Sequence, residues 1–149
     1  MVVYGQGTMY IGDEAYVSDI VFWDSGTSIA SGVFDPYNMM GAQNDGQFAR
    51  IYTGNPGDYA YIISTLNRQA SGEIHLWAHT GTGYYSHLIV YVSNDYSNWY
   101  TKYNGYITNS NPYDIYCGPH NNFRYVAVAV YDDVGWSTNL RIDAVHVSG

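Results

Sequence analysis

Charged residues are scarce in this chain, and positively charged ones are the scarcest of all. Only 12% of the 149 residues are charged, and five Lys and Arg against thirteen Asp and Glu leave a net charge of −8. The five cations stand singly, at Arg50, Arg68, Lys102, Arg124 and Arg141. Binding to nucleic acid or to an anionic membrane surface requires clustered cations that displace counterions. The sequence therefore argues against both kinds of partner.

Cysteine and long apolar runs are scarce too. Cys117 is the single cysteine, which excludes an internal disulfide framework and a Cys-rich zinc site and predicts a small buried residue. No run approaches the roughly 20 apolar residues that cross a bilayer, so membrane insertion is not expected. Met1–Tyr4 lacks the basic and apolar regions of a signal peptide, so we expect none in this chain. If the chain is one domain of a larger protein, the targeting signal would lie elsewhere.

Aromatic residues, by contrast, are abundant and lie in β-type patterns. They make up 17% of the chain and include 18 tyrosines, too many for a disordered segment. Alternating segments bounded by Gly, Asn and Ser predict strands throughout, with turns between them, including Ser71-Gly72 and Asn55–Asp58. The clearest predicted strands are Ala15–Trp23, Gln47–Thr53, Gly57–Ser64, Glu73–His79, His87–Ser93, Trp99–Ile107, Phe123–Tyr131 and Leu140–Val147.

This strand pattern predicts the fold class. Eight to ten short strands at such spacing are typical of an all-β antiparallel β-sandwich, or jelly roll. The length fits one domain over residues 1–149, in which residues 1–14 form an extra edge strand or a leader. Phe123–Tyr131 is apolar at nearly every position, which predicts a central strand covered on both faces. Trp77 lies inside a strand and Trp99 begins one, so both are expected in the core.

The segment Gly41–Tyr52 combines a polar turn with the start of a strand. Asn44-Asp45-Gly46 has turn chemistry, because Gly tolerates positive φ and Asp can accept hydrogen bonds from its own backbone. A carboxylate among exposed loop carbonyls is also the oxygen-rich setting that a calcium ion needs. The residues alone therefore leave two interpretations of Asp45 open, a turn residue and a metal ligand.

Three segments together resemble a known family. Val90–Trp99 (V-Y-V-S-N-D-Y-S-N-W) resembles the V-x-x-S-x-D-G-x-x-W hairpin of galactose-binding-like jelly rolls, the discoidin and carbohydrate-binding-module group, with Tyr96 at the usual Gly. Asn44–Arg50 is similar to the loop-to-strand segment A-x-D-G-x-x-A/T of the same group. Arg141–Val145 resembles its closing strand, where an acidic residue returns beside the first loop.

The resemblance implies one structural calcium ion. Carried over by position, Asp45 and Asp143 would be side-chain ligands, with candidate loop contributors at Asn38, Gln43 and Asn44. Asp143 shares strand parity with an otherwise apolar face, so its carboxylate needs a partner. Calcium would satisfy it, and so would an arginine (Arg50 or Arg124) or a set of backbone amides.

The resemblance also implies glycan binding by loops at one end of the sandwich. The segment His79–His87 (H-T-G-T-G-Y-Y-S-H) suits sugars best, because Tyr84 and Tyr85 stand on a glycine-rich loop between His79 and His87. Trp136, on a polar turn, is a second candidate. One tyrosine could instead fold back onto the sandwich, and a loop Trp is often a lid on the core.

No enzyme motif accompanies these residues. There is no G-x-S-x-G elbow, no H-E-x-x-H and no phosphate loop, so we expect no catalytic activity and no catalytic residues. Asp132 and Asp133 are neighbours and on a strand would face opposite sides. His75 and His79 share a strand face but lie about 13 Å apart along it, too far to bind one metal ion.

Two functions of different class are compatible with these features. The first is a non-catalytic carbohydrate-binding module of a secreted or cell-surface protein, with glycan as partner, a structural calcium, and other domains of a larger chain beside it. The alternative is a structural surface protein, such as an adhesin, envelope or filament subunit, that uses the sandwich for protein–protein contacts. The abundance of tyrosine suits the alternative, because Tyr is enriched where proteins meet.

Overall fold

The computed structural model describes residues 2–3, 8–10, 15–23, 32–40, 46–133 and 138–148. These ranges contain ten strands, one short 3-10 helix and no α-helix. The elements are β1 (Val2–Val3), β2 (Thr8–Tyr10), β3 (Ala15–Trp23), β4 (Gly32–Phe34), η2 (Pro36–Met40), β5 (Ala49–Thr53), β6 (Tyr59–Thr80), β7 (Ser86–Ser93), β8 (Trp99–Ile107), β9 (Tyr113–Tyr131) and β10 (Thr138–Ser148). No helix in these ranges is long and apolar enough to cross a lipid bilayer.

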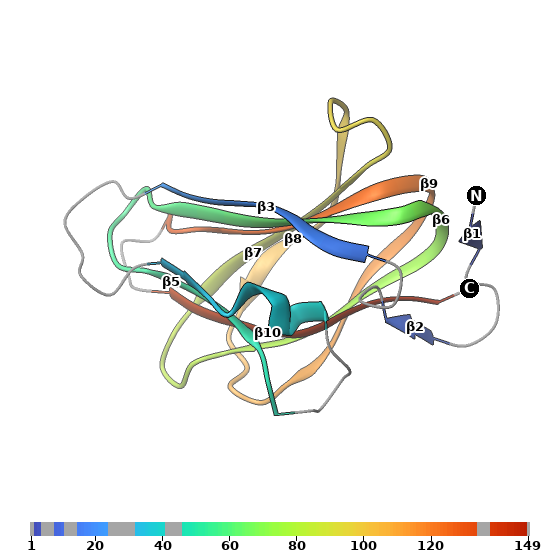
Figure 1. The fold of residues 1–149 in the computed structure, drawn as a ribbon. Coiled ribbons are helices and arrows are strands. Elements are labelled where there is room, and N and C mark those ends of the chain that lie inside the picture. Colours follow the sequence, from blue (N-terminus) through green and yellow to red (C-terminus); the bar gives the residue numbers. More distant parts are fainter. Residues whose placement is uncertain are drawn as a thin grey trace.

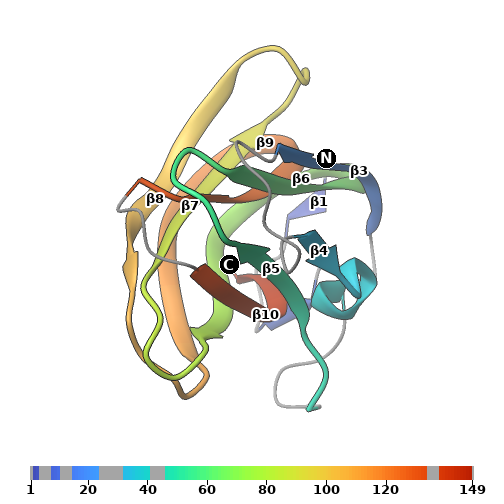
Figure 2. The ribbon, with the colours of Figure 1, turned by 90° about the vertical axis from the view of Figure 1, so that its left-hand side faces the viewer.

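The strands form two layers that share their longest members (Figure 1). We call the layer ordered β3-β6-β9-β7-β8 the upper sheet, and the layer ordered β4-β5-β10-β6-β9 the lower sheet. Every pairing is antiparallel except that of β1 with β6. Figure 2 shows the two layers from the end of the sandwich. The predicted all-β antiparallel sandwich of eight to ten strands is confirmed.

The two longest strands, β6 and β9, bend from one sheet into the other. Their pairing is regular from Tyr59 to Thr65, breaks, and resumes at Ala70. The predicted turn at Ser71-Gly72 is therefore wrong, because one continuous strand runs through it. The glycine is needed for close approach instead: a Cβ there would lie 2.7 Å from the carbonyl oxygen of Ser148 on β10. Gly72 lets β10 pass against the bend.

The core lies between the sheets and follows the alternation of the strands. Inward-facing residues of β9 are fully buried, and the largest fully buried side chain is Phe123, near the bend. Cys117 is 3% exposed, which confirms the predicted small buried residue, and burial raises the pKa of its thiol to about 12. The inward face of each sheet is thus mainly apolar, although it includes the fully buried Ser64, and most polar residues lie on the outward faces and at the strand ends.

Buried polar groups hold the strand ends beside the upper sheet. The predicted turn at Asn55–Asp58 is present, and Asp58 is fully buried behind it. One carboxylate oxygen of Asp58 accepts hydrogen bonds from the backbone amides of Gly54 and Asn55. The backbone amide of Asp132, at the end of β9, donates to the carbonyl of Asp58. These bonds fix the start of β6 against the end of β9, and so the register of the upper sheet.

Candidate functional site

A trough runs along β9 on the outer face of the upper sheet. Ala127 and Ala129 point outward there, between taller side chains on both neighbouring strands. On the β6 side, Tyr61 lies opposite Ala129 and Ile63 opposite Ala127. On the β7 side, Tyr91 lies opposite Ala127. Because cross-strand partners stand side by side, two alanines flanked by larger residues form a floor with walls.

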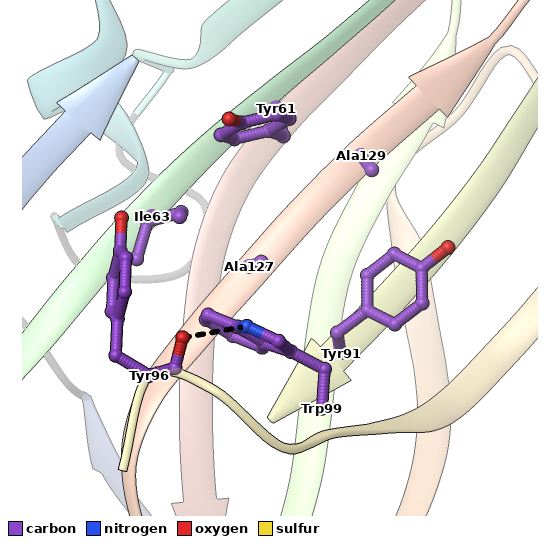
Figure 3. Close-up of a pocket in the computed structure, with 7 residues that line it drawn as sticks. All are labelled: Tyr61, Ile63, Tyr91, Tyr96, Trp99, Ala127 and Ala129. Atoms are coloured by element: carbon purple, nitrogen blue, oxygen red, sulfur yellow. Dashed lines mark hydrogen bonds between the residues drawn. The ribbon is translucent and has the colours of Figure 1, made fainter. Parts of the chain in front are cut away.

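The hairpin between β7 and β8 closes one end of this trough. Its tip, residues 94–98, stands above the outer face of the upper sheet (Figure 1). Tyr96 and Trp99 line the trough, and Figure 3 shows both of them on the side of the sheet from which Ala127 and Ala129 of β9 project. The Trp99 indole N–H donates to the carbonyl oxygen of Tyr96 at 3.2 Å. The ring of Tyr96 packs edge-on against Trp99 and Tyr125, at 5.4 and 5.1 Å between centroids.

Asp95 holds the tip of the hairpin in shape. Its Oδ1 accepts hydrogen bonds from the backbone amides of Ser97 and Asn98, at 2.9 and 2.8 Å, and its Oδ2 accepts one from the Asn98 side chain. Ser93 Oγ accepts from the backbone amide of Tyr96 at 3.0 Å. The hydrogen bonds from Asn98 and Ser97 hold the pKa of the Asp95 carboxyl well below its usual range. The Ser-x-Asp pattern that carried the family resemblance therefore positions Tyr96 and Trp99, the aromatic wall of the trough.

Tyr96 itself adopts a backbone conformation that tyrosine rarely takes. Its φ is +67°, in the left-handed region, which matches the glycine expected at this point of the hairpin. Such a conformation costs roughly 1–2 kcal/mol for a residue with a Cβ. Its side chain is held in place as well, because the Tyr96 hydroxyl donates to Asp19 Oδ2 at 3.2 Å. Strain of this size persists where surrounding contacts over-determine it, and such positions cluster at functional sites.

We name this region the aromatic groove, and it is hollow and largely apolar. Its volume is about 360 Å³. Its seven lining residues are Tyr61, Ile63, Tyr91, Tyr96, Trp99, Ala127 and Ala129. None of these residues was predicted from the sequence to bind a ligand. The prediction for Trp99 was wrong, because this residue was expected in the core but lines the groove in a half-buried position.

More aromatic side chains continue along the same outer face. His87 on β7 stacks on Tyr106 at 4.8 Å and lies 6.4 Å from the ring of Tyr131. Asp133 accepts a hydrogen bond from the Tyr106 hydroxyl at 2.7 Å and lies 3.0 Å from His87 Nδ1. Tyr59 lies opposite Tyr131 in the pairing of β6 with β9, and Trp23 stacks on Tyr59 at 5.6 Å. The outer face thus offers aromatic rings well beyond the groove itself.

The residues predicted to bind a ligand lie in different surroundings. His79 is 5% exposed, with its ring edge-on to Phe48 at 5.2 Å, and burial chiefly, then Arg141, lowers its pKa. Tyr84 packs against Tyr52, and the two hydroxyls are 2.8 Å apart. Tyr84 thus folds back, as one of the two alternatives anticipated.

Two other predicted ligand residues face outward. Tyr85, beside Tyr84, is 44% exposed. His87 lies on the outer face of the upper sheet, in the cluster with Tyr106 and Asp133. Trp136 lies outside the described residues.

Of the predicted calcium ligands, Asn38 and Asp143 lie in the described part of the chain. Asp143 is 3% exposed and sits where the pairing of β10 with β6 shifts register. The helix η2, which carries Asn38, packs against β10. The Asn38 side-chain amide donates to the carbonyl of Phe48 at 3.4 Å. Gln43, Asn44 and Asp45 lie outside the described residues.

The two arginines considered as partners of Asp143 contact other groups. Arg50 lies 4.0 Å from Asp35 and its guanidinium stands over the ring of Phe34. Arg124 donates to the backbone carbonyl of Leu66 at 3.1 Å.

A different set of metal-ligating side chains gathers on the outer face of the lower sheet. One imidazole nitrogen from each of His75 and His146 and one carboxylate oxygen of Asp114 all lie within 4.8 Å of one another. Within the described ranges this is the one group of three or more His, Cys, Asp or Glu close enough to share an ion. The partners of His75 come from two other strands, so the spacing of His75 and His79 along one strand did not predict this group.

Comparisons with known proteins bear on the fold. No protein-family model matches the chain, and no curated protein sequence matches it. Among solved structures, the C-terminal domain of a chitobiase from Bacteroides fragilis matches with a TM-score of 0.63 and 18% identity, over 96% of this chain and 97% of that one. A pectin-binding carbohydrate-binding module matches with a TM-score of 0.55 and 16% identity, over 91% and 92% of the two chains.

A third match comes from a longer enzyme. A Ruminococcus gnavus family GH29 fucosidase, solved with fucose, matches with a TM-score of 0.57 and 14% identity, over 94% of this chain and 26% of that one. At such identities the likeness concerns the fold alone. The resemblance stated from the sequence is confirmed at that level: the chain has the galactose-binding-like jelly-roll fold seen in carbohydrate-binding modules.

Proposed function

We propose that the chain is a non-catalytic glycan-binding module and that the aromatic groove is its main binding surface. The observation that carries this proposal is the alanine floor of Ala127 and Ala129 beneath walls of Tyr91, Tyr96 and Trp99. The groove is preformed, because hydrogen bonds and ring contacts fix the hairpin that supplies two of the walls. A preformed site loses less conformational entropy on binding.

The chemistry of the groove suits a sugar. Pyranose rings present apolar C–H faces that pack on aromatic rings, and hydroxyl groups at their edges that need polar partners. The half-buried indole of Trp99 and the phenol of Tyr91 supply apolar surface. Desolvation chiefly raises the pKa of the Tyr61 phenol, so this hydroxyl keeps its proton at neutral pH and can both donate and accept. The small floor residues allow a flat ring to lie low between the walls.

The loop residues predicted from the sequence are a second contact region in this proposal. Tyr85 is the best placed of them, because it is 44% exposed next to the start of β7. His87 extends the aromatic face of the upper sheet, and Trp136 would add a ring from the loop after β9. His79 and Tyr84 would act indirectly. Their contacts with Phe48 and Tyr52 would support the loop between β6 and β7, which carries Tyr85.

The proposal also includes a structural calcium ion, bound near η2 and near the point where β10 shifts register. The candidate donors are all oxygen atoms: the carboxylates of Asp143 and Asp45, and amide or carbonyl oxygens of Asn38, Gln43 and Asn44. Such a set fits a hard cation that takes about 6–8 oxygen ligands. The position of Asp143 supports this assignment, because its carboxylate is buried on β10, the strand against which η2 packs. When bound, the ion would hold the early loop against the last strand.

The setting we propose is a secreted or cell-surface protein in which this domain accompanies others. The fold occupies about a quarter of the fucosidase chain that it matches. A module that binds a glycan without altering it would keep an attached domain close to that glycan, which raises its effective concentration there.

Glycan binding is tested by measuring affinity for a panel of soluble chitin-, pectin-, glucan- and fucose-containing oligosaccharides by calorimetry. Trp99→Ala should weaken binding at least about thirtyfold, the loss typical of an aromatic anchor, with an unchanged fold by circular dichroism. The matched control is Tyr100→Ala, the next residue, which is 54% exposed but packs toward His120. Equal losses in both variants would assign the effect to the strand rather than to the groove.

The alternative of a structural surface protein predicts a different outcome. A folded wild-type chain that binds no sugar in a broad glycan array, and that assembles with rising concentration, would favour the structural role. Sedimentation velocity over a hundredfold concentration range measures this assembly.

Calcium is tested by thermal unfolding in chelator and at increasing free calcium. The melting temperature should rise with the logarithm of free calcium, because the ion binds the folded chain alone. Asp143→Asn should abolish the dependence. An identical melting temperature in chelator and at saturating calcium would end the calcium assignment while leaving glycan binding untouched.

A further inference from the structure

The cluster of His75, Asp114 and His146 comes from three adjacent strands of the lower sheet. His146 on β10 lies directly opposite His75 on β6. Asp114 on β9 lies opposite Trp77, one step along the same face from His75. Residues at such cross-strand and diagonal positions are within reach of one another. The cluster therefore joins segments that are up to 71 residues apart in the chain.

The carboxylate of Asp114 contacts both imidazoles. Its Oδ2 is 2.9 Å from His75 Nδ1 and its Oδ1 is 3.5 Å from His146 Nε2. The two rings are nearly parallel, at 9° with centroids 4.8 Å apart. Two nitrogens and one oxygen from three side chains thus lie within 4.8 Å of one another.

We propose that His75, Asp114 and His146 bind one zinc ion that cross-links β10, β6 and β9. Zinc in proteins is held by imidazole nitrogen and carboxylate oxygen at about 2.0–2.2 Å, and sites with three protein ligands keep a fourth position for water. Two nitrogen donors favour such a borderline ion over calcium or magnesium, which prefer oxygen. This site is separate from the proposed calcium site, and it does not rest on glycan binding.

Small movements bring the three donors into a zinc geometry. Ligand atoms around a tetrahedral zinc ion are about 3.3 Å apart, given bonds of about 2.0–2.1 Å. The Oδ1 of Asp114 lies 3.1 Å from His75 Nδ1 and 3.5 Å from His146 Nε2, and these two distances already bracket that spacing. The parallel rings cannot both point a lone pair at one ion, so one must turn. His146 is the ring that turns, because His75 already directs Nδ1 at the shared carboxylate.

The surroundings of His75 match those of a metal-binding histidine. Its second nitrogen, Nε2, lies 3.3 Å from the hydroxyl of Ser148, which can accept the remaining ring proton. Histidine ligands usually donate their other N–H in this way, which fixes the tautomer. The ring of Tyr116 packs against that of His75 at 5.2 Å, and its hydroxyl donates a hydrogen bond to Glu73 at 3.0 Å. These contacts restrain the His75 ring.

The site is sheltered but open to solvent on one side. The side chains of His75 and His146 are 17% and 8% exposed, while that of Asp114 is 43% exposed. An ion can enter past the carboxylate and keep one water as its fourth ligand.

A zinc ion here would act where the lower sheet is least regular. The pairing of β6 with β9 shifts register between Ile74 and His75. The pairing of β10 with β6 shifts between Ile142 and Ala144, close to His146. A cross-link through side chains would hold three strands together where backbone pairing is interrupted.

Calorimetry of the full chain, prepared without a histidine tag and stripped with chelator, tests the proposal. Zinc is titrated at saturating calcium so that any calcium site is filled. Wild type should bind one zinc ion per chain. Asp114→Asn and His146→Asn should bind at least about tenfold more weakly, since even outer-shell changes cost that much. His120→Asn, at a histidine that packs on Tyr100 and Phe123, is the matched control and should bind as wild type does.

Cobalt(II) provides a spectroscopic readout that a purely structural role would not produce. Wild type and His120→Asn should show the strong visible bands of a tetrahedral cobalt centre, and Asp114→Asn should not. Because Asp114 is exposed, its variant remains folded even if His146→Asn does not. Zinc affinities that are equal in wild type and Asp114→Asn, or no binding to wild type, would overturn the proposal.

Discussion

The outward faces of β6 and β9 change character where the two strands pass from one sheet to the other. In the upper sheet the outward residues are tyrosine, isoleucine and alanine, and they form a groove with an apolar floor. In the lower sheet the outward residues of the same strands are polar: His75 contacts Asp114 at 2.9 Å, and the Tyr116 hydroxyl donates to Glu73. The inward residues are apolar in both halves.

This difference shows how one pair of strands can present an apolar outward surface in one sheet and a polar outward surface in the other. Side chains alternate between the faces of a strand, so the inward face can remain uniformly apolar while the outward face varies freely. A row of small residues leaves space for a ligand, whereas a row of polar residues satisfies its own hydrogen bonds. On the proposals above, the upper half would receive a sugar and the lower half a single metal ion.

The most severe test of this contrast is to fill the floor of the groove. Ala129→Arg places a long side chain where a sugar ring would lie, and affinity for the best oligosaccharide should fall at least about a hundredfold, or about 2.7 kcal/mol. Ala129 is half-buried on the outer face, so the core is not disturbed and the melting temperature should stay close to that of wild type. Calorimetry and thermal unfolding measure the two effects.

The control for this variant changes the same residue without filling the space. Ala129→Ser should bind within about twofold of wild type, because its hydroxyl is small and faces the open groove. Unchanged affinity in Ala129→Arg would show that the ligand binds elsewhere, with the loop around Tyr85 as the next surface to test.

A smaller effect is expected from removing the strained wall residue. Tyr96→Gly relieves the left-handed strain, roughly 1–2 kcal/mol, but loses ring contacts with Trp99 and Tyr125 and the hydrogen bond to Asp19. The two effects oppose each other, so the free energy of unfolding should change by less than about 1 kcal/mol. Glycan affinity should nevertheless fall about tenfold, because a wall of the groove is missing.

Denaturant unfolding and calorimetry on the same preparation separate these two quantities. The comparison variant is Tyr96→Phe, which keeps the ring and loses the hydroxyl. Full affinity in Tyr96→Gly would mean that the Tyr96 side chain has no role in binding.

A feature of this molecule is predictable from the sequence when the residues that determine it are close together in the chain. The bounds of β3 and β8 agree with prediction at both ends, because alternation and turn signals are local. The Ser93–Asp95 hairpin was also visible, since its hydrogen bonds join residues within a few positions of one another. Gly72 shows the limit of local signals: a glycine next to a serine indicates a turn, but here it makes room for β10.

Both surface sites depend on strand register, which the sequence does not reveal locally. The groove requires Tyr61, Tyr91 and Ala129 to stand side by side, although each comes from a different strand. A shift of one residue in any pairing would turn those side chains toward the core. The alternating alanines of β9 were a usable signal, because small residues at every second position mark one face as open.

The same limit applies to the histidines. Comparing His75 with His79 along one strand was correct in geometry but tested the wrong neighbours. The relevant partners, Asp114 and His146, are identified only once the order β10-β6-β9 is known.

A change in pH should affect the lower sheet and spare the groove. Burial chiefly, and then Arg141, lowers the pKa of His79 in the folded chain. Below the ordinary pKa of about 6.5 the unfolded chain takes up a proton that folded His79 resists, so the stability that depends on neutral His79 is present above that pH and lost below it. The melting temperature should fall by a few degrees between pH 7.5 and 5.5, and less in His79→Leu.

Glycan affinity is the internal comparison for this pH experiment. None of the groove's lining residues is a histidine. Binding measured at 20 °C, well below unfolding, should therefore be nearly equal at the two pH values. An equal pH dependence of stability in wild type and His79→Leu would remove His79 as the cause.

The smallest expected effect is that of zinc on the groove. The proposed zinc ligands His75 and Asp114 lie beyond the bend of β6 and β9, separated from the groove by the register break between Thr65 and Ala70. Energetic effects of groups more than about 7–10 Å apart, with no shared partners, usually add within about 0.5 kcal/mol. Saturating zinc should therefore change glycan affinity by no more than about twofold, although it raises the melting temperature. A larger change would show that zinc binding at the lower sheet and glycan binding at the upper sheet are energetically coupled through the long strands.

Repeating the titration with Asp114→Asn identifies the route, because zinc acting through the cluster loses its effect in that variant, whereas zinc acting at the groove does not.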